Sequence, residues 1–187
     1  TLGLWGPEAK NALGHFIDPS EISIDNFPFV TAKYLTLNLL GGKKIDVWAA
    51  RISYVGESGW ELYLNNDSED GLALYDSLLE VGVVPVGIET YANSRRLEKS
   101  FRLQGADLET NYNACESAIE RRLVKAADFH GKAAHLAHRE ERPSSILCTM
   151  TLDDLNVSGN SSRYPVGISP IIDPATGEVP IDSKGRR

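Results

Sequence analysis

The chain has 187 residues, of which 42% are hydrophobic, and its formal net charge is −7. This length suits one domain, or one domain and part of another, and the apolar content is sufficient for a packed core. The negative charge is spread along the chain, which argues against nucleic-acid binding, because phosphate contacts need a basic face. No run reaches the roughly 18 apolar residues of a membrane-spanning helix, and no signal-peptide pattern opens the chain.

The cysteines, Cys115 and Cys148, form neither a CxxC pair nor a disulfide framework. We expect both to be buried free thiols, the usual state of unpaired cysteine, and we expect a reducing, cytoplasmic compartment. Glycosylation sequons at Asn156 and Asn160 then indicate only a polar loop. The chain opens without methionine inside an expected strand and stops after a turn-rich stretch, so we expect a fragment of a longer protein.

The first elements are a short strand and a helix. Residues 2–5 predict the strand, and Pro7 suits the first helical position, where its missing N–H costs nothing. Apolar residues then recur with helical spacing. This stripe comprises Ala9, Leu13, Phe16 and Ile17.

Three strands are predicted next. Apolar and polar residues alternate over 35–39 and again over 45–54, on either side of Gly41-Gly42, which predicts a β-hairpin. Residues 61–64 return as the third strand.

Helices dominate the middle of the chain. Residues 68–82 predict an amphipathic helix that begins with acidic residues and ends at Gly82. A second helix is predicted over 88–101, and weaker, more polar helices over 116–127 and 131–141. The expected inner face of the first of these helices comprises Leu72, Tyr75, Leu78 and Leu79.

The last part of the chain reads as a linker at 142–145, a strand at 146–152 and a turn-rich β region rich in proline. Strands and helices are mixed along the whole chain without a strict βαβ rhythm. The expected fold class is therefore α+β, with a mostly antiparallel sheet.

Several site types lack support. His130, His135 and His138 cluster near the polar helix, and the last two are i,i+3 neighbours, a spacing that a metal site can use. Neither a cysteine nor a close carboxylate completes a ligand set, so solvated surface histidines are the favoured interpretation. The chain also has no GxGxxG, P-loop or GxSxG motif, which leaves nucleotide-binding and serine-hydrolase functions unsupported.

Residues 53–64, SYVGESGWELYL, carry more chemistry than a chain reversal needs. Tyr54 and Glu61 lie symmetrically about the turn, and residues opposite each other in a hairpin point to one face. A carboxylate accepts two parallel N–H bonds from a fork-shaped donor, and the aminopyrimidinone edge of guanine or a pterin is such a fork. Tyr54 would then pack against the flat ring. On these residues alone, a surface loop with satisfied polar groups is an equally good interpretation.

Three segments together resemble the aminomethyltransferase family, the glycine-cleavage T-protein family. They are RISYVGESGWELYL at 51–64, ANSRRLEKSFRLQGADLET at 92–110 and ADFHGKAA at 127–134. The resemblance covers essentially the whole chain. It implies that residues 1–142 form the C-terminal part of a folate-binding domain and that residues 143–187 begin a C-terminal β-barrel domain.

The resemblance also implies roles for the hairpin, which in this family helps to bind the pterin of tetrahydrofolate. Glu61 would hold the aminopyrimidinone edge and Tyr54 would line the ring. Gly56 and Glu57 fit the turn, with Glu57 in a structural role. The family's catalytic aspartate lies upstream of the position of Thr1, so the catalytic residue is unknown here, and the chain alone is expected to be inactive.

The segment around Ala92 departs from the T-proteins of the glycine cleavage system, which carry a folate-binding arginine at that position. It resembles instead the folate domains of dimethylglycine and sarcosine dehydrogenases and of related folate-dependent demethylases, whose helix Arg96, Glu98 and Lys99 match. Without a ligand role, Arg95 and Arg96 would form a solvated, charge-balanced helix face.

The implied function is tetrahydrofolate-dependent one-carbon transfer from dimethylglycine, sarcosine or a similar methylated donor, with FAD in an upstream domain if the whole protein is a dehydrogenase. No nucleic acid or membrane partner is expected. One alternative is a glycine-cleavage aminomethyltransferase, against which Ala92 argues. The other is a non-catalytic folate-binding protein of the same fold, whose Lys-Gly-Cys-Tyr motif is missing from this sequence.

The histidine interpretation gives a first prediction. Because no complete ligand set accompanies His130, His135 and His138, elemental analysis of the purified protein should find no stoichiometric zinc. Zinc that is present and then lost on substitution of His135 and His138 would contradict it.

Overall fold

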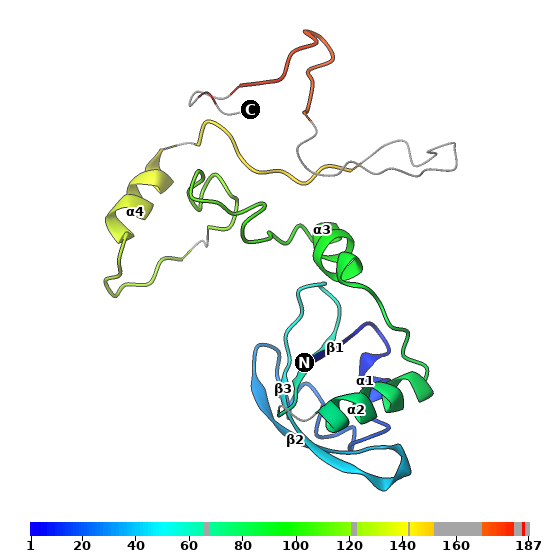
Figure 1. The fold of residues 1–187 in the computed structure, drawn as a ribbon. Helices are drawn as coiled ribbons and strands as arrows, with labels where there is room; N and C mark the ends of the chain where they lie inside the picture. Colours follow the sequence, from blue (N-terminus) through cyan, green and yellow to red (C-terminus); the bar gives the residue numbers. More distant parts are fainter. Residues whose placement is uncertain (66–67, 121–122, 142, 152–169, 182–184, 186–187) are drawn as a thin grey trace. The chain divides into compact units, whose positions relative to one another are not determined.

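The structure is a computed structural model, and it describes residues 1–65, 68–120, 123–141, 143–151, 170–181 and 185. The chain divides into two compact units, Thr1–Phe101 and Arg102–Arg187. The first unit carries a sheet with helices, and the described part of the second carries a helix among turns and extended segments (Figure 1). The predicted domain boundary at residue 143 stays a prediction.

A sheet of four antiparallel strands, in the order β1-β4-β3-β2, forms the first unit. The predicted α+β class with an antiparallel sheet is confirmed there. The first strand of the chain pairs with the last, so β1 lies at one edge of the sheet and β2 at the other. The strands are β1 Leu2–Trp5, β2 Ala32–Asn38, β3 Lys44–Ala50 and β4 Gly59–Tyr63.

One face of this sheet is buried against α1, Ala9–Leu13, and α2, Ser68–Glu80, which Figure 1 shows on the same side. Alternate residues of each strand point to that face, as the pleat requires. Fully burying one large apolar side chain contributes about 1.5–3 kcal/mol, so this core dominates the unit's stability. Its largest fully buried members are Trp60, Phe16, Phe27, Leu13, Ile22, Leu37, Leu62, Leu74 and Val47.

The β2–β3 hairpin has the predicted alternation, with Leu35 opposite Val47. Its turn contains Gly41 and Gly42 at φ 83° and 86°, a region that favours glycine. The prediction that β3 runs on to residue 54 is wrong. The Ile52 N–H donates to the Ala50 carbonyl at 3.0 Å, and this tight turn takes the chain out of the sheet after Ala50.

Helix α2 is present as predicted and is followed by Gly82 at φ 89°, but most of its predicted inner face is wrong. Leu72 is 61% exposed, and Tyr75 and Leu79 are each 37% exposed. The helix is rotated so that a small side chain, Ser77, is buried instead of the larger ones predicted. Among the side chains of α2 whose burial the structure describes, those buried are Leu74, Ser77 and Leu78.

The helix predicted over 88–101 is confirmed over 88–98 and changes its type along that range. A π-helical turn, η2, spans Thr90–Arg95, and an α-helical turn, α3, spans Arg96–Glu98. π-Helical turns are rare and occur frequently at functional sites.

In the second unit, the helix predicted over 131–141 is confirmed as α4, Lys132–Glu140. The helix predicted over 116–127 is wrong, because its described residues form turns and coil. The Asn113 side chain accepts the backbone N–H groups of Cys115 and Glu116 at 2.9 Å each, an alternative to helical hydrogen bonding.

The strand predicted over 146–152 is also wrong for its described residues, 146–151. The Leu147 N–H donates to the Glu116 carbonyl at 2.8 Å, and the Leu147 carbonyl accepts from the Arg102 guanidinium at 3.2 Å. These bonds occupy the groups that a neighbouring strand would need. The sequons and most of the expected β region lie outside the described residues, so the barrel stays a prediction.

No helix in the described part of the chain combines the length and apolarity needed to cross a bilayer.

The close approach of β1 and β4 gives a second prediction. A Cβ at Gly59 would lie 2.0 Å from the Leu4 carbonyl oxygen, a backbone atom that cannot move without disturbing the β1–β4 pairing. Gly59→Ala should therefore lower the free energy of unfolding by about 2–3 kcal/mol in urea denaturation.

Gly71 in α2 provides the control, because a Cβ there would meet nothing within 4 Å. Gly71→Ala should be neutral or stabilise by up to about 1 kcal/mol. Equal stability of the two variants would show that the β1–β4 contact is not tight.

Candidate functional site

A groove of about 490 Å³ lies in the first unit. Its walls come from β1, β4, α2 and the segment 83–91. Among the described residues that line it, Glu61 is the only charged side chain, and apolar side chains predominate. Such a lining suits a flat, largely apolar ligand that presents hydrogen-bond donors along one edge.

Glu61 stands in β4, between Gly3 of β1 and Ala50 of β3. Its side chain is half-buried and accepts a hydrogen bond from the Tyr63 hydroxyl. Tyr54 is not opposite Glu61, as the sequence interpretation assumed, because β3 ends at Ala50 and Tyr54 lies in the β3–β4 loop.

Tyr54 is not among the residues that line the groove, but its ring contacts Tyr91, a half-buried residue of η2 that does line it. The ring centroids of Tyr54 and Tyr91 are 5.5 Å apart. The pKa of Tyr91 is raised by burial first, then by the negative charge of Glu61 and by the neighbouring Tyr54. Tyr91 is therefore close to both predicted ligand residues, and it also lines the groove.

Four rings make contact in sequence, and we call them the aromatic chain: Trp5, Tyr91, Tyr54 and Phe101. Successive centroids are 5.1, 5.5 and 6.1 Å apart. The Trp5 indole N–H also donates to the Ile52 carbonyl at 3.2 Å, which holds the start of the β3–β4 loop. Aromatic pairs in this range contribute about 0.5–1.5 kcal/mol beyond their buried area.

The tip of the β3–β4 loop is fitted closely to α3. A Cβ at Gly56, where φ is 71°, would lie 2.3 Å from Cγ of Lys99. Glu57 pairs with the Lys99 ammonium at 3.9 Å. These contacts agree with the turn and structural roles predicted for Gly56 and Glu57.

Arg95 and Arg96 have different environments. Arg95 is exposed and pairs with Glu98 at 3.0 Å, as expected for a solvated helix face. Arg96 is buried, and its guanidinium donates to the carbonyls of Ala92 at 2.6 Å and Phe101 at 3.1 Å. The prediction of a solvated Arg96 is wrong, because this side chain ties η2 to the backbone of Phe101, a member of the aromatic chain.

The sequence around this site matches a known protein family. The family model described as the GCVT N-terminal domain matches residues 1–127. The chain belongs to this family. The suspected family is thus confirmed, and the match contains the whole groove and the aromatic chain.

Two relatives illustrate the match. The chain is 37% identical over 171 residues to mitochondrial dimethylglycine dehydrogenase of Homo sapiens, which covers 87% of this chain and 19% of that protein. It is 32% identical over 168 residues to the aminomethyltransferase of Halothermothrix orenii, which covers 88% of this chain and 44% of that protein. The chain therefore spans less than half the length of the relatives it matches. The name of the first of these relatives includes the word mitochondrial. The cytoplasmic location expected for this chain stays a prediction.

The sequence analysis did not identify Trp5 and Tyr91 as members of the candidate site. The sequence predicts Trp5 only as a residue of the first strand, although alternation with Leu2 and Leu4 indicates that its side chain points away from the core. Tyr91 immediately precedes Ala92 in the family-like helix segment. Their convergence depends on contacts between residues far apart in sequence, which local spacing does not encode.

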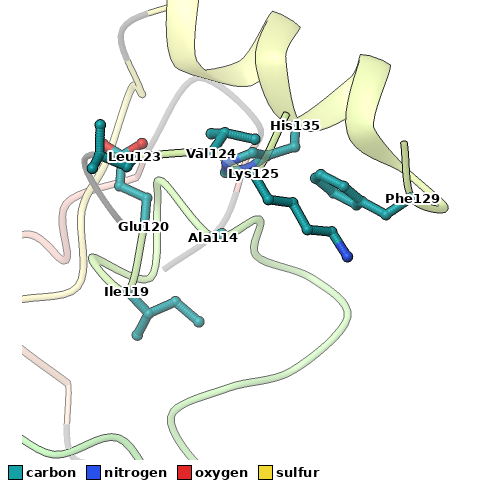
Figure 2. A pocket seen from close by; sticks show the side chains of 8 residues that line it. All are labelled: Ala114, Ile119, Glu120, Leu123, Val124, Lys125, Phe129 and His135. Carbon is teal, nitrogen blue, oxygen red and sulfur yellow. The ribbon is translucent and has the colours of Figure 1, made fainter. Parts of the chain in front are cut away.

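The histidines lie in the second unit. His130 is exposed as predicted, but His135 and His138 are half-buried on α4, so their prediction as solvated residues is wrong in part. His135 lines a hollow of about 340 Å³ together with Glu120 and Phe129, and Figure 2 shows Lys125 extended beside the Phe129 ring. Within the described residues, no group of three or more histidine, cysteine or carboxylate side chains is arranged to hold a metal ion.

The cysteines also differ from each other. Cys115 is buried as predicted, and its thiol lies 3.3 Å from the Glu120 carboxylate. Burial, followed by that contact, raises the pKa of the Cys115 thiol. Cys148 is exposed, which contradicts its prediction as a buried thiol, because the segment around it is not part of a sheet.

The environment of Tyr91 gives a third prediction. Because its pKa is raised in the folded state, the unfolded state loses this proton first as the pH rises. The corresponding stability is fully present below a pH of about 10, the ordinary value for tyrosine, and is lost as the pH rises through the folded-state pKa. Urea unfolding from pH 9 upward should therefore show a shallower loss of stability in Tyr91→Phe than in wild type. Identical slopes would contradict this environment.

Proposed function

We propose that this chain supplies folate-binding residues to a tetrahydrofolate-dependent one-carbon transferase whose donor is dimethylglycine, sarcosine or a similar methylated amine. The observation that carries the proposal is the Glu61 carboxylate on an apolar groove beside Tyr91, in a member of the GCVT N-terminal domain family. Relatives named dimethylglycine dehydrogenase and aminomethyltransferase support the reaction class.

The residues of the groove fit a pterin. The Glu61 carboxylate has two oxygens, which match the two parallel N–H donors of an aminopyrimidinone edge. Trp5 and Tyr91, the two members of the aromatic chain that line the groove, offer apolar ring surface beside that carboxylate. With no basic side chain among the described lining residues, the groove suits the uncharged ring better than the anionic glutamate tail.

The chemical contribution of these residues is orientation. Bound tetrahydrofolate supplies the nitrogen that takes up the one-carbon unit. Glu61 fixes the far edge of the ring, Trp5 and Tyr91 fix its plane, and the other apolar lining residues keep water away. Holding two reactants in a productive geometry accounts for a large part of the rate in such transfers. The acid–base carboxylate is proposed to lie in a part of the whole protein beyond these residues.

The donor separates the main proposal from the alternative, a glycine-cleavage aminomethyltransferase. Curated aminomethyltransferases match the chain at about the same coverage as dimethylglycine dehydrogenase, so both reactions are worth assaying. Ala92 favours the methylated amine, because its short side chain cannot supply the arginine expected by resemblance in T-proteins. Oxidation of a methylated amine needs an electron acceptor, and FAD in a further domain of the whole protein is the proposed one.

The donor assay uses the longest natural chain that carries these residues. Folate-dependent turnover of dimethylglycine or sarcosine with an electron acceptor supports the main proposal. Turnover of glycine with the remaining glycine-cleavage proteins, without activity on methylated amines, would replace it by the alternative.

The fourth prediction concerns Glu61. In that same protein, Glu61→Gln should weaken tetrahydrofolate binding by about 1–3 kcal/mol, since one partner of a charged hydrogen-bond pair is lost. Isothermal titration calorimetry measures the effect directly.

Glu57→Gln is the matched control, because Glu57 lies in the loop just before β4 and its carboxylate pairs with Lys99, away from the groove. It should change binding by less than about 0.5 kcal/mol, as expected for a partly exposed ion pair. A wild-type dissociation constant for Glu61→Gln would exclude Glu61 as the pterin ligand.

A further inference from the structure

We propose that Tyr63 is a positioning residue for the ligand edge: its hydroxyl holds the Glu61 carboxylate in the orientation that accepts the two N–H donors of the pterin. This inference rests on the proposed function of Glu61 and extends it to a residue outside the predicted site. Neither the groove lining nor the hairpin turn includes Tyr63.

The first step is the strand geometry. In β4, Trp60 and Leu62 are fully buried on the core face, so Glu61 and Tyr63 share the opposite face. On that face the Tyr63 hydroxyl donates to Oε2 of Glu61. The pKa of Tyr63 is raised, by this hydrogen bond first and then by burial, by the charge of Glu61 and by Tyr91, which agrees with the contact.

The Glu61 carboxylate has enough acceptor positions for both Tyr63 and a ligand. An ionised carboxylate has about four lone-pair positions, two on each oxygen. Tyr63 uses one position on Oε2 and leaves at least one on each oxygen. A fork of two parallel N–H groups therefore still finds both oxygens available, and the hydroxyl and the ligand do not compete.

Tyr63 has aromatic neighbours on its own face of the sheet. Tyr63 lies opposite Trp48 of β3, and the Trp48 ring meets that of Tyr34 edge-on at 4.6 Å between centroids. Tyrosine has only two side-chain torsions, whereas a free glutamate must give up more rotamer freedom when it binds a ligand. Tyr63 thus orders Glu61 before the ligand arrives, and preorganisation of this kind favours binding.

The first experiment needs no ligand. Tyrosine labelled with ¹³C at Cζ reports the ionisation of Tyr63 by NMR, assigned with Tyr63→Phe. In Glu61→Gln the pKa of Tyr63 should fall toward the ordinary value of tyrosine, because its main raising contact has lost its charge. An unchanged pKa would show that the two side chains do not interact, and would overturn the inference whatever the ligand is.

The second experiment measures binding in the longest natural chain that carries these residues. Tyr63→Phe keeps the ring and removes only the hydroxyl, so it should weaken tetrahydrofolate binding about three- to tenfold, as expected for one hydrogen bond. In the Glu61→Gln background the same change should have little further effect, because the two residues act as one unit. Tyr34→Phe removes a hydroxyl from the same sheet face, away from Glu61, and should bind as wild type does.

A ligand analogue tests whether the binding loss in Tyr63→Phe depends on the two N–H donors of the pterin edge. Replacing the 2-amino group of the pterin by methyl removes one of the two donors, so Tyr63→Phe should weaken this analogue less than tetrahydrofolate. Equal losses for both ligands would mean a general structural effect and would overturn the positioning role.

The outcomes separate the two claims. If Glu61→Gln weakens binding and Tyr63→Phe does not, the function proposed for Glu61 stands and the role of Tyr63 fails. Tighter binding by Tyr63→Phe would mean that the hydroxyl competes with the ligand, which also overturns the inference. If Glu61→Gln binds as wild type, the proposed function itself fails, and the positioning role fails with it.

Discussion

The candidate site depends on the close packing of the Trp5 ring against strands β1 and β4. A Cβ at Gly3 would lie 1.9 Å from Cη2 of Trp5, so the ring occupies the space that any side chain at that position would fill. Gly59, opposite Trp5 in β4, lets the two strands approach closely. Two missing side chains therefore place the indole against the sheet, and Tyr91 packs on it. The positions of Trp5 and Tyr91, which both line the groove, therefore depend on these two glycines.

Contacts that begin at Trp5 continue through several side chains to Phe101. Its indole N–H ties down the β3–β4 loop at Ile52, while the rings of Tyr91, Tyr54 and Phe101 continue the contact. Arg96 then fixes the Phe101 backbone by a charge-assisted hydrogen bond from inside the protein. The β3–β4 loop is thus held at Ile52 by the Trp5 indole, at Tyr54 by the neighbouring rings and at Glu57 by Lys99, which is what a site for a rigid, flat ligand needs.

Local sequence patterns predicted those elements whose partners are near in sequence. The β2–β3 hairpin follows from alternation around Gly41, and α4 follows from its helical pattern. Helix α1 follows from helical spacing only in part, because it ends at Leu13, before Phe16 and Ile17 of the predicted stripe. The resemblance implied a ligand role for Glu61, which lines the groove, but it did not predict that Tyr91 would lie between Glu61 and Tyr54. That link requires a turn at Ile52, which ends β3 early, and a helix segment from elsewhere in the chain.

The inner face of α2 was mispredicted for a related reason. Tyr75 and Leu79 are apolar enough to be predicted as core residues, yet they line the groove, while the polar Ser77 is buried. Spacing alone cannot distinguish an apolar stripe that packs on a core from one that lines a binding site. The strand expected over 146–152 failed because the Leu147 backbone bonds to Glu116 and Arg102, partners that only the folded chain brings together.

The π-helical turn η2 also makes the site tolerant of a change in chain length. In a π-helical turn, residues five apart are one turn apart, whereas in an α-helix the same holds for residues four apart. Tyr91 and Arg96 are five apart, so η2 aligns them as an α-helix would align a pair with one fewer residue between them. A homologue shortened by one residue within 92–95 could close this segment as an ordinary α-helix. Its tyrosine and arginine would again lie one turn apart, so the loss of one residue at this point would keep the spacing between the groove residue and the buried guanidinium.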